Sequence, residues 1–222
     1  MSQNAYDKLN PIRQPDLRVI DAPLVAASDS NLKGYGYVVD NYEDCEIEIT
    51  RWPAQGWRSV DEDTGDEGGT TEGTFHFNWQ GDMLYGFNDA VNDRYLLGWS
   101  EYPTDASENT APPDRTHVYL RHANYHPDGG QLFFPKAKTP FVTPLCLPGD
   151  DVTPEMFVNF YCDGTQGLYI HAGVWHEAIF PMDEQASFLD KQGKVHARVS
   201  CNFDSEFGAY LRAPLANPNE NS

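Results

Sequence analysis

Short runs of branched and aromatic residues, separated by glycine and proline turns, follow one another along most of this 222-residue chain. Runs such as Tyr35 to Val39 and Gln131 to Pro135 have the length of a strand, and apolar and polar residues alternate through 45–52. A period of two is typical of a half-buried β-strand. Further strands are predicted over 74–79, 83–87, 94–99, 117–122, 140–147, 167–171, 187–190 and 195–202. Convincing helical periodicity is absent from every ten-residue stretch, and Thr153-Pro154-Glu155 predicts only one or two helical turns. We therefore predict an all-β fold of the sandwich or barrel type with few short helices.

The chain has the length of one large or two small domains, and single all-β domains of this size are common. Residues 1–32 are polar and interrupted by prolines, so we expect an N-terminal arm that packs on the domain or on a partner subunit. Residues 33–215 are predicted to form a single domain, and residues 216–222 a disordered tail. An acidic, glycine-rich loop is predicted over 53–72. It lacks the spacing of a calcium-binding loop, so we interpret it as a solvated loop that is long enough to cover a pocket.

Charge and composition restrict the partners of this chain. The sequence has 15 basic and 34 acidic residues, for a net charge of −19. This charge argues against binding to nucleic acids or anionic membranes, whereas a small anionic substrate needs only a local pocket of donors. No apolar run is long enough to span a membrane, and no signal peptide is visible. The four cysteines are scattered without a CxxC pair, which indicates buried free thiols in a reducing compartment. We expect a soluble cytoplasmic protein.

Two pairs of histidines are the candidates for chemistry. His122 and His126 flank the end of a predicted strand, whereas His171 and His176 lie on either side of an Ala-Gly turn. Imidazoles held on a rigid backbone can bind a metal, transfer protons or hold an anion. The spacing alone does not separate such a site from histidines that hydrogen-bond locally. No cofactor is assigned. If a divalent metal is present, we expect its ligands among these four histidines.

Two blocks of sequence carry a resemblance to a known family. In 164–176, Gly-Thr-Gln-Gly-Leu-Tyr-Ile-His-Ala-Gly-Val-Trp-His, the residues Gly164, Gly167, His171, Trp175 and His176 match the pattern G-x-x-G-x-N-Y-H-x-x-x-W-H in register. In 126–135, His-Pro-Asp-Gly-Gly-Gln-Leu-Phe-Phe-Pro is similar to H-P-x-x-x-Q-x-F-x-P. Both patterns are those of the ureidoglycolate lyase family, and the first resembles the second cupin motif. The chain departs from the family where Tyr169 replaces its Asn and Asn124 replaces its Glu.

The resemblance implies a cupin-type β-barrel or jelly roll, and a carbon–nitrogen (amidine-type) lyase that splits ureidoglycolate into glyoxylate and urea in allantoin nitrogen catabolism. Such an elimination needs a base, an acid and donors for the carboxylate. On this basis we expect His171 and His176 as the acid/base pair, with His126 opposite them. The candidate substrate-binding residues are Gln131, Tyr169, Trp175 and His122. By analogy with other cupins, a homodimer is expected.

Two alternatives remain open from the sequence. One is a metal-dependent cupin, a dioxygenase or isomerase, that acts on another small carboxylate through a subset of the histidines. The other is a non-catalytic cupin that binds a small ligand. Metal content after purification would separate the first alternative from the lyase.

Overall fold

The computed structural model describes residues 13–51, 53–54, 56–62, 64–65, 67–111, 114–195 and 197–220. Strands make up most of the regular structure in these ranges. The helices among them are a 3₁₀ helix at Pro154–Met156, where the sequence predicts a short helix, and α1 at Phe203–Phe207. The all-β prediction is confirmed, and the architecture is cupin-like. Within the described ranges, no helix has both the length and the apolar character needed to cross a membrane.

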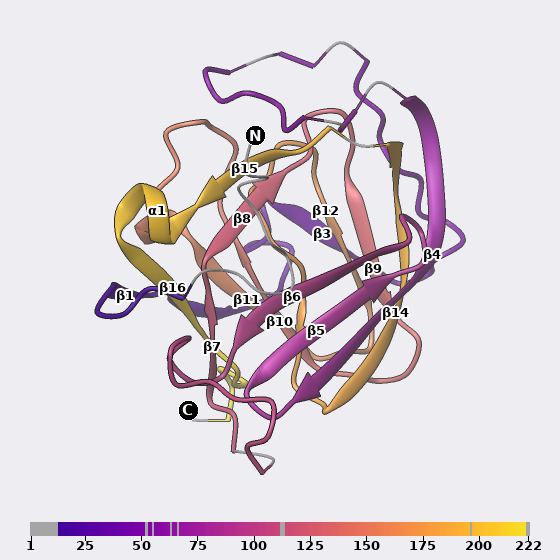
Figure 1. Ribbon diagram of the computed structural model, residues 1–222. Coiled ribbons are helices and arrows are strands. Elements are labelled where there is room, and N and C mark those ends of the chain that lie inside the picture. The colour runs from indigo at the N-terminus through magenta and orange to yellow at the C-terminus, as the bar shows by residue number, and fades with distance from the viewer. Residues whose placement is uncertain are drawn as a thin grey trace.

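Ten strands form the largest sheet (Figure 1). Their order is β1 (Arg18–Asp21), β16 (Ala209–Pro214), β7 (His117–Leu120), β6 (Asp93–Trp99), β5 (Met83–Asn88), β4 (Glu67–Gln80), β14 (Gln185–Val195), β9 (Gln131–Pro135), β12 (Gly167–Ile170) and β3 (Gly36–Val39). The neighbours are antiparallel, apart from the parallel pair β1 and β16. Among the described strands the sheet is open, with β1 and β3 at its two edges.

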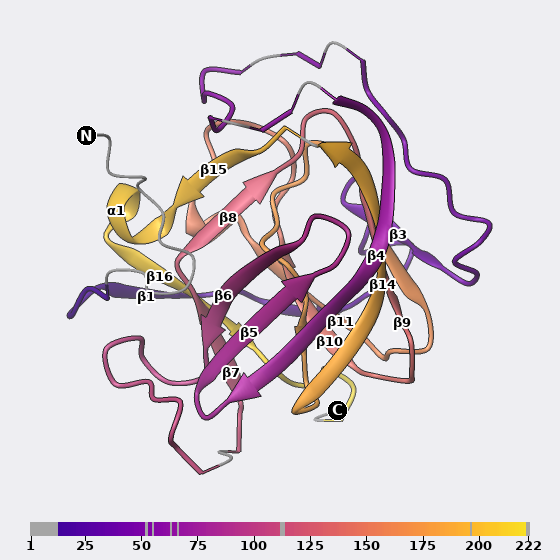
Figure 2. The same ribbon diagram turned by 45° about the vertical axis from the view of Figure 1, so that its right-hand side comes forward.

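Two smaller sheets complete the fold (Figure 2). One has the order β13 (Phe180–Pro181), β10 (Phe141–Leu145), β11 (Val158–Cys162) and β2 (Leu24–Ala26), and the other pairs β15 (Val199–Asn202) with β8 (His122–Tyr125). Strands β1 and β2 lie in the predicted N-terminal arm. Since β1 pairs with β16 and β2 pairs with β11, this segment is joined by hydrogen bonds to two different sheets.

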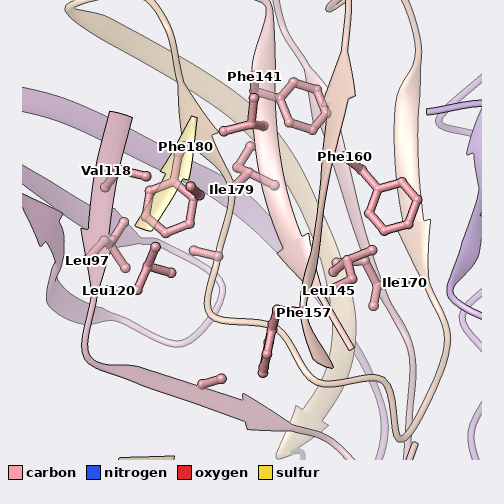
Figure 3. Close-up of a cluster of buried hydrophobic side chains, with 14 of the residues drawn as sticks. Leu97, Val118, Leu120, Phe141, Leu145, Phe157, Phe160, Ile170, Ile179 and Phe180 are labelled. Atoms are coloured by element: carbon pink, nitrogen blue, oxygen red, sulfur yellow. The ribbon is translucent and has the colours of Figure 1, made fainter. Parts of the chain in front are cut away.

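The main hydrophobic core lies between the large sheet and the four-stranded sheet. The side chains labelled in Figure 3 come from both, and Phe141 on β10 meets Phe188 on β14 with ring centroids 5.2 Å apart. Both phenylalanines are fully buried. The four cysteines, Cys45, Cys146, Cys162 and Cys201, are buried free thiols, as predicted. Burial of aromatic and aliphatic side chains of this kind supplies most of the free energy that stabilises the fold.

The inward-facing positions change from apolar to polar toward one end of the interior. On β14 the core residue Phe188 is followed at spacings of two by Asp190 and Gln192, which are 0% and 1% exposed. On β9 the core residue Phe133 is preceded at the same spacing by the buried Gln131. Because strand side chains alternate between faces, these polar groups point to the same side as the core. Gln131 and Gln192 line a polar pocket, and Asp190 is hydrogen-bonded to Gln131.

Several predicted boundaries are wrong. Residues 45–52 are not a strand: Ile49 forms an isolated bridge with Gly129, and Trp52 lies outside the described residues. The alternation is nevertheless reflected in burial, since Cys45 and Ile47 pack in a small cluster on the outer side of the sheet. The predicted acidic loop is also shorter than expected, because β4 takes in residues 67–72 and pairs them with β14.

Candidate functional site

A pocket opens where the polar ends of the inward-facing strand positions meet. Its polar lining consists of Asn88, His122, Asn124, His126, Gln131, Glu177, Gln192 and Arg198. Its remaining wall is formed by Phe75, Val91, Tyr95, Leu97 and Ala178. These residues come from β4, β5, β6, β8, β9 and β14 and from the segments beside them. We refer to this site as the polar pocket.

Strand β8 brings the first histidine pair to the polar pocket. His122, Asn124 and His126 occupy alternate positions and line the pocket, whereas Ala123 and Tyr125 between them belong to the hydrophobic core. Period-two alternation therefore turns both histidines to one side. Both are buried, at 4% and 6% exposure.

His122 is paired with a carboxylate. Its Nδ1 is hydrogen-bonded to Glu177 Oε2, and both side chains are almost fully buried. A carboxylate on one ring nitrogen orients the imidazole and stabilises the imidazolium that forms when the ring accepts a proton. This pair therefore has the chemistry of a general base.

His126 is oriented by the backbone. Its Nδ1 donates to the carbonyl oxygen of Ala197 at 3.0 Å, because a carbonyl oxygen can only accept. The ring lies against that of His176, with centroids 5.2 Å apart. His126 thus has a fixed tautomer and a fixed orientation at the pocket.

His176 lies directly behind the polar pocket. Its Nδ1 donates to Val174 O at 2.8 Å, and its Nε2 lies 3.3 Å from Gln131 Oε1. Burial lowers the pKa of His176, and the side chain is only 2% exposed. His176 is placed to support Gln131 and His126 from within the core.

Gln131 connects this histidine to a buried carboxylate. Gln131 Nε2 donates to Asp190 Oδ1 at 2.7 Å, and Asn88 Nδ2 donates to Asp190 Oδ2 at 3.0 Å. Burial raises the pKa of Asp190 to about 6, although both amide hydrogen bonds oppose that rise. The Gln131 amide nitrogen is consequently held by Asp190 at the wall of the pocket.

Two polar atoms of the pocket lining are buried without a recorded partner. Among the residues that the structure describes, Asn124 Oδ1 and Gln192 Nε2 have no hydrogen-bond partner. Burying an unpaired amide atom costs roughly 1–3 kcal/mol, so a ligand that pairs both atoms would gain affinity from them. The oxygen can accept a hydrogen bond and the amide nitrogen can donate one. A ligand that carries both donors and acceptors complements this wall.

The structure places the other three predicted site residues outside the pocket lining. His171 lies near the rings of Tyr37 and Tyr169, with centroids 5.8 Å and 5.7 Å away. Tyr169 is buried in the small outer cluster, where its hydroxyl accepts a hydrogen bond from Glu48 N. Trp175 is fully buried in the main core and donates from Nε1 to Gly149 O. The Ala-Gly turn therefore separates His171 from His176.

Four histidines were the predicted candidates for metal ligands. Over the described ranges, no group of three or more His, Cys, Asp or Glu side chains is arranged to hold a metal ion. The four predicted histidines are not together, because His171 lies outside the pocket lining, beside the rings of Tyr37 and Tyr169. The described side chains of the pocket therefore do not form a set of three metal ligands.

Glu177, Gln192, Asp190 and Arg198 are pocket residues or supports that the sequence analysis did not identify. Glu177 directly follows His176, so an acidic neighbour of the histidine motif was a usable signal. Asp190 is a charged residue at an inward-facing position of a strand, which is visible only once the register is known. Arg198 lies in an irregular segment between β14 and β15, where no local pattern indicates a site.

Comparison with known proteins bears on this same part of the chain. Residues 104–206 match the family model of ureidoglycolate lyase. We refer to residues 104–206 as the lyase-family region. The predicted resemblance is thereby confirmed, and this lyase-family region includes His122, His126, Gln131, Glu177, Gln192 and Arg198.

Individual relatives agree with the family match. A ureidoglycolate lyase of Pseudomonas savastanoi pv. phaseolicola is 30% identical over 96 residues, which are 42% of this chain and 54% of the relative. One of Pseudomonas paraeruginosa is 30% identical over 104 residues, 46% of this chain and 59% of the relative. One of Azotobacter vinelandii is 30% identical over 100 residues, 39% of this chain and 60% of the relative. The chain thus spans little more than half the length of these curated relatives.

Proposed function

We propose that this protein is a ureidoglycolate lyase-like enzyme that splits ureidoglycolate, or a closely similar small ureido acid, into glyoxylate and urea. The observation that carries the proposal is that a carboxylate-paired histidine and an arginine, all from the lyase-family region, line one polar pocket. Among the described lining residues, Arg198 is the permanent cation and Glu177 the carboxylate. A pocket with a cation and a carboxylate-paired histidine can bind a small anionic substrate and exchange a proton with it.

The reaction is an elimination at a carbon that carries a hydroxyl, a carboxylate and a ureido group. His122 removes the hydroxyl proton, the C–O bond becomes C=O, and the C–N bond breaks with its electron pair on nitrogen. A proton must then reach that nitrogen to release neutral urea. The Glu177 carboxylate stabilises the imidazolium of His122 between the two transfers. His126, oriented by Ala197 O, is the second group available as the acid.

Recognition of the two ends of the substrate is divided between the walls of the pocket. Arg198 binds the carboxylate, since a guanidinium offers several donors in the geometry that a carboxylate accepts. The unpaired Asn124 Oδ1 and Gln192 Nε2 complement a ureido group, which has N–H donors and a carbonyl acceptor. Gln131 adds an amide held by Asp190. His176 acts as a positioning residue for Gln131 in this scheme.

Urea release from racemic ureidoglycolate by the purified protein tests the proposal. The variant Glu177→Gln should lower kcat by about 10- to 100-fold, because the imidazolium of His122 loses its counter-charge. Glu155→Gln is the matched control, since Glu155 is half exposed and lies outside the pocket lining, and it should leave kcat unchanged. Absence of urea release by the folded wild-type protein would overturn the lyase function. If urea release disappears with a chelator and returns with one metal, the reaction depends on a metal and the acid/base roles given to the histidines are wrong.

Cellular context and assembly belong to the same proposal. We place the enzyme in the cytoplasm, in the breakdown of allantoin and purine nitrogen, as a homodimer. An edge strand supports self-association, because β3 ends the large sheet and its Tyr37 is 40% exposed. Light scattering coupled to size-exclusion chromatography measures the mass directly, and a monomer at micromolar concentration would exclude the dimer.

A further inference from the structure

The segment 56–65 lies outside the lyase-family region, yet its Asp61 is hydrogen-bonded to Arg198, which lines the polar pocket. It belongs to the loop between β3 and β4, which runs along the top of Figure 2 above β15 and β8. The family match begins at residue 104, so this segment precedes the matched range. Asp63 lies outside the described residues, and the contacts below are those of Asp61, Thr64 and Gly65.

Asp61 holds both the side chain and the backbone of Arg198. Arg198 Nε donates to Asp61 Oδ2 at 2.7 Å, and Asp61 N donates to Arg198 O at 2.7 Å. Arg198 N donates in turn to Thr64 Oγ1 at 3.1 Å, and Thr64 Oγ1 donates to Asp61 O at 2.8 Å. The turn is therefore hydrogen-bonded to three atoms of Arg198: the side-chain Nε and the backbone N and O.

The carboxylate of Asp61 is itself held in place. Its Oδ2 accepts a second hydrogen bond from Ser200 Oγ at 2.6 Å. The Asp61 and Arg198 side chains are 26% and 25% exposed, so water screens the pair only in part. A guanidinium has five N–H donors, and Asp61 occupies the one on Nε. The fixed Nε sets the plane in which the remaining donors lie.

The same turn also packs on the residue that orients His126. Gly65 has a positive φ of +89°, and a Cβ placed there would come within 3.1 Å of Ala197 Cβ. Ala197 O accepts the hydrogen bond from His126 Nδ1, and Ala197 N donates to Asp128 Oδ2 at 2.8 Å. The Ala197–Arg198 segment is thus clamped between the 61–65 turn and the segment that carries His126.

We infer that Asp61 is a positioning residue of the polar pocket, which holds the Arg198 guanidinium in the orientation that binds a substrate carboxylate. This inference rests on the proposed function, in which Arg198 is the carboxylate anchor. A long arginine side chain that is already ordered loses less conformational freedom when the anion binds. The acidic loop thereby contributes to recognition of an anion, although its own charge would repel one.

The affinity for an anion tests whether Asp61 acts by positioning Arg198 or only through its charge. The two explanations predict changes in affinity of opposite sign when Asp61 is neutralised. The full-length protein is titrated by calorimetry with glyoxylate, the proposed carboxylate product, and with urea, the proposed neutral product. Asp61→Asn removes a negative charge near the site, so long-range electrostatics alone would tighten glyoxylate binding. Loss of positioning should weaken it about tenfold. Urea binding should not change in this variant.

The matched control is Glu62→Gln, which removes a neighbouring exposed negative charge from the same turn without touching Arg198. It should leave glyoxylate affinity unchanged or slightly higher. Arg198→Gln should lose glyoxylate binding and retain urea binding. In turnover, Asp61→Asn should raise KM for ureidoglycolate more than it lowers kcat.

Glyoxylate affinity in Asp61→Asn equal to or above that of the wild type, with binding lost in Arg198→Gln, would overturn the inference. Failure of the wild type to bind glyoxylate would overturn it as well, whereas urea release in turnover would keep the proposed function. Glyoxylate binding that needs both Arg198 and Asp61, without any urea release, would retain the positioning role and reject the lyase. If Asp61→Asn does not fold, Ser200→Ala keeps the charge and removes one bond to Asp61. An unchanged glyoxylate affinity in that variant would also overturn the inference.

Discussion

Asp190 is a fully buried carboxylate on β14 that accepts hydrogen bonds from Gln131 Nε2 and Asn88 Nδ2. Burial is the largest influence on this group, and it raises the pKa from 3.8 to about 6. The folded protein therefore binds the Asp190 proton more tightly than the unfolded chain does. Folding linkage then favours the folded state at low pH, and this contribution is lost as the pH rises from about 4 through about 6.

The variant Asp190→Asn isolates that contribution. A pKa difference of about two units corresponds to a change on the order of 3 kcal/mol in the free energy of unfolding. We expect the free energy of unfolding of the wild type, minus that of Asp190→Asn, to fall by roughly this amount between pH 4 and pH 7. Urea denaturation of both proteins at several pH values measures the difference. A difference independent of pH would show that Asp190 does not titrate in this range.

At the scale of elements, the turn between β11 and β12 depends on Gly164. This residue has φ of +78°, and a Cβ at this position would lie 2.2 Å from the carbonyl carbon and oxygen of Thr139. The left-handed backbone and the close approach both require glycine. The turn positions the start of β12, which pairs with β9 and β3 in the large sheet.

Replacement of Gly164 by alanine should therefore destabilise the protein by about 3 kcal/mol or more, because the clash with Thr139 adds to backbone strain. Gly208→Ala is the matched control. Gly208 ends α1 with φ of +60°, and nothing lies within 4 Å of its Cβ position. That substitution should cost about 1 kcal/mol from the backbone alone. Chemical denaturation gives both values, and equal costs would contradict the role assigned to the Thr139 contact.

At the scale of the whole molecule, the net charge of −19 opposes the compact state. Like charges held on one small surface repel one another, and salt screens that repulsion over a Debye length of about 10 Å at 0.1 M. The charge is carried mostly by exposed side chains. The pocket combines Arg198, Glu177 and neutral amides. A negative molecule can therefore still present a local site for an anion.

Screening should raise the melting temperature. We expect an increase of about 2–4 °C between about 20 mM and about 300 mM NaCl, which corresponds to roughly 1 kcal/mol for a domain of this size. Differential scanning calorimetry at constant pH measures it, with KCl as the control for ion-specific effects. A melting temperature that falls with salt would mean that attractive ion pairs outweigh the net repulsion.

The alternation of residues along the chain determined which side chains are buried. It correctly indicated the strands that became β5, β6, β9 and β12. It failed for 45–52, where the pattern reports burial on the outside of the sheet rather than pairing within it. The pairings of β1 with β16 and of β2 with β11 join segments far apart in the chain, so no local sequence pattern predicts them.

What the sequence by itself determined is the all-β class, the lyase-family region and the choice of His122, His126 and Gln131 among the candidate site residues, because these follow from local periodicity and motif. Only the tertiary structure decided the hydrogen bonds of Glu177 with His122, of Asp190 with Gln131 and of Asp61 with Arg198. Each of these contacts joins segments that are far apart in the chain. Their meeting depends on strand register and loop path, which are set by packing of the whole molecule and not by neighbouring residues.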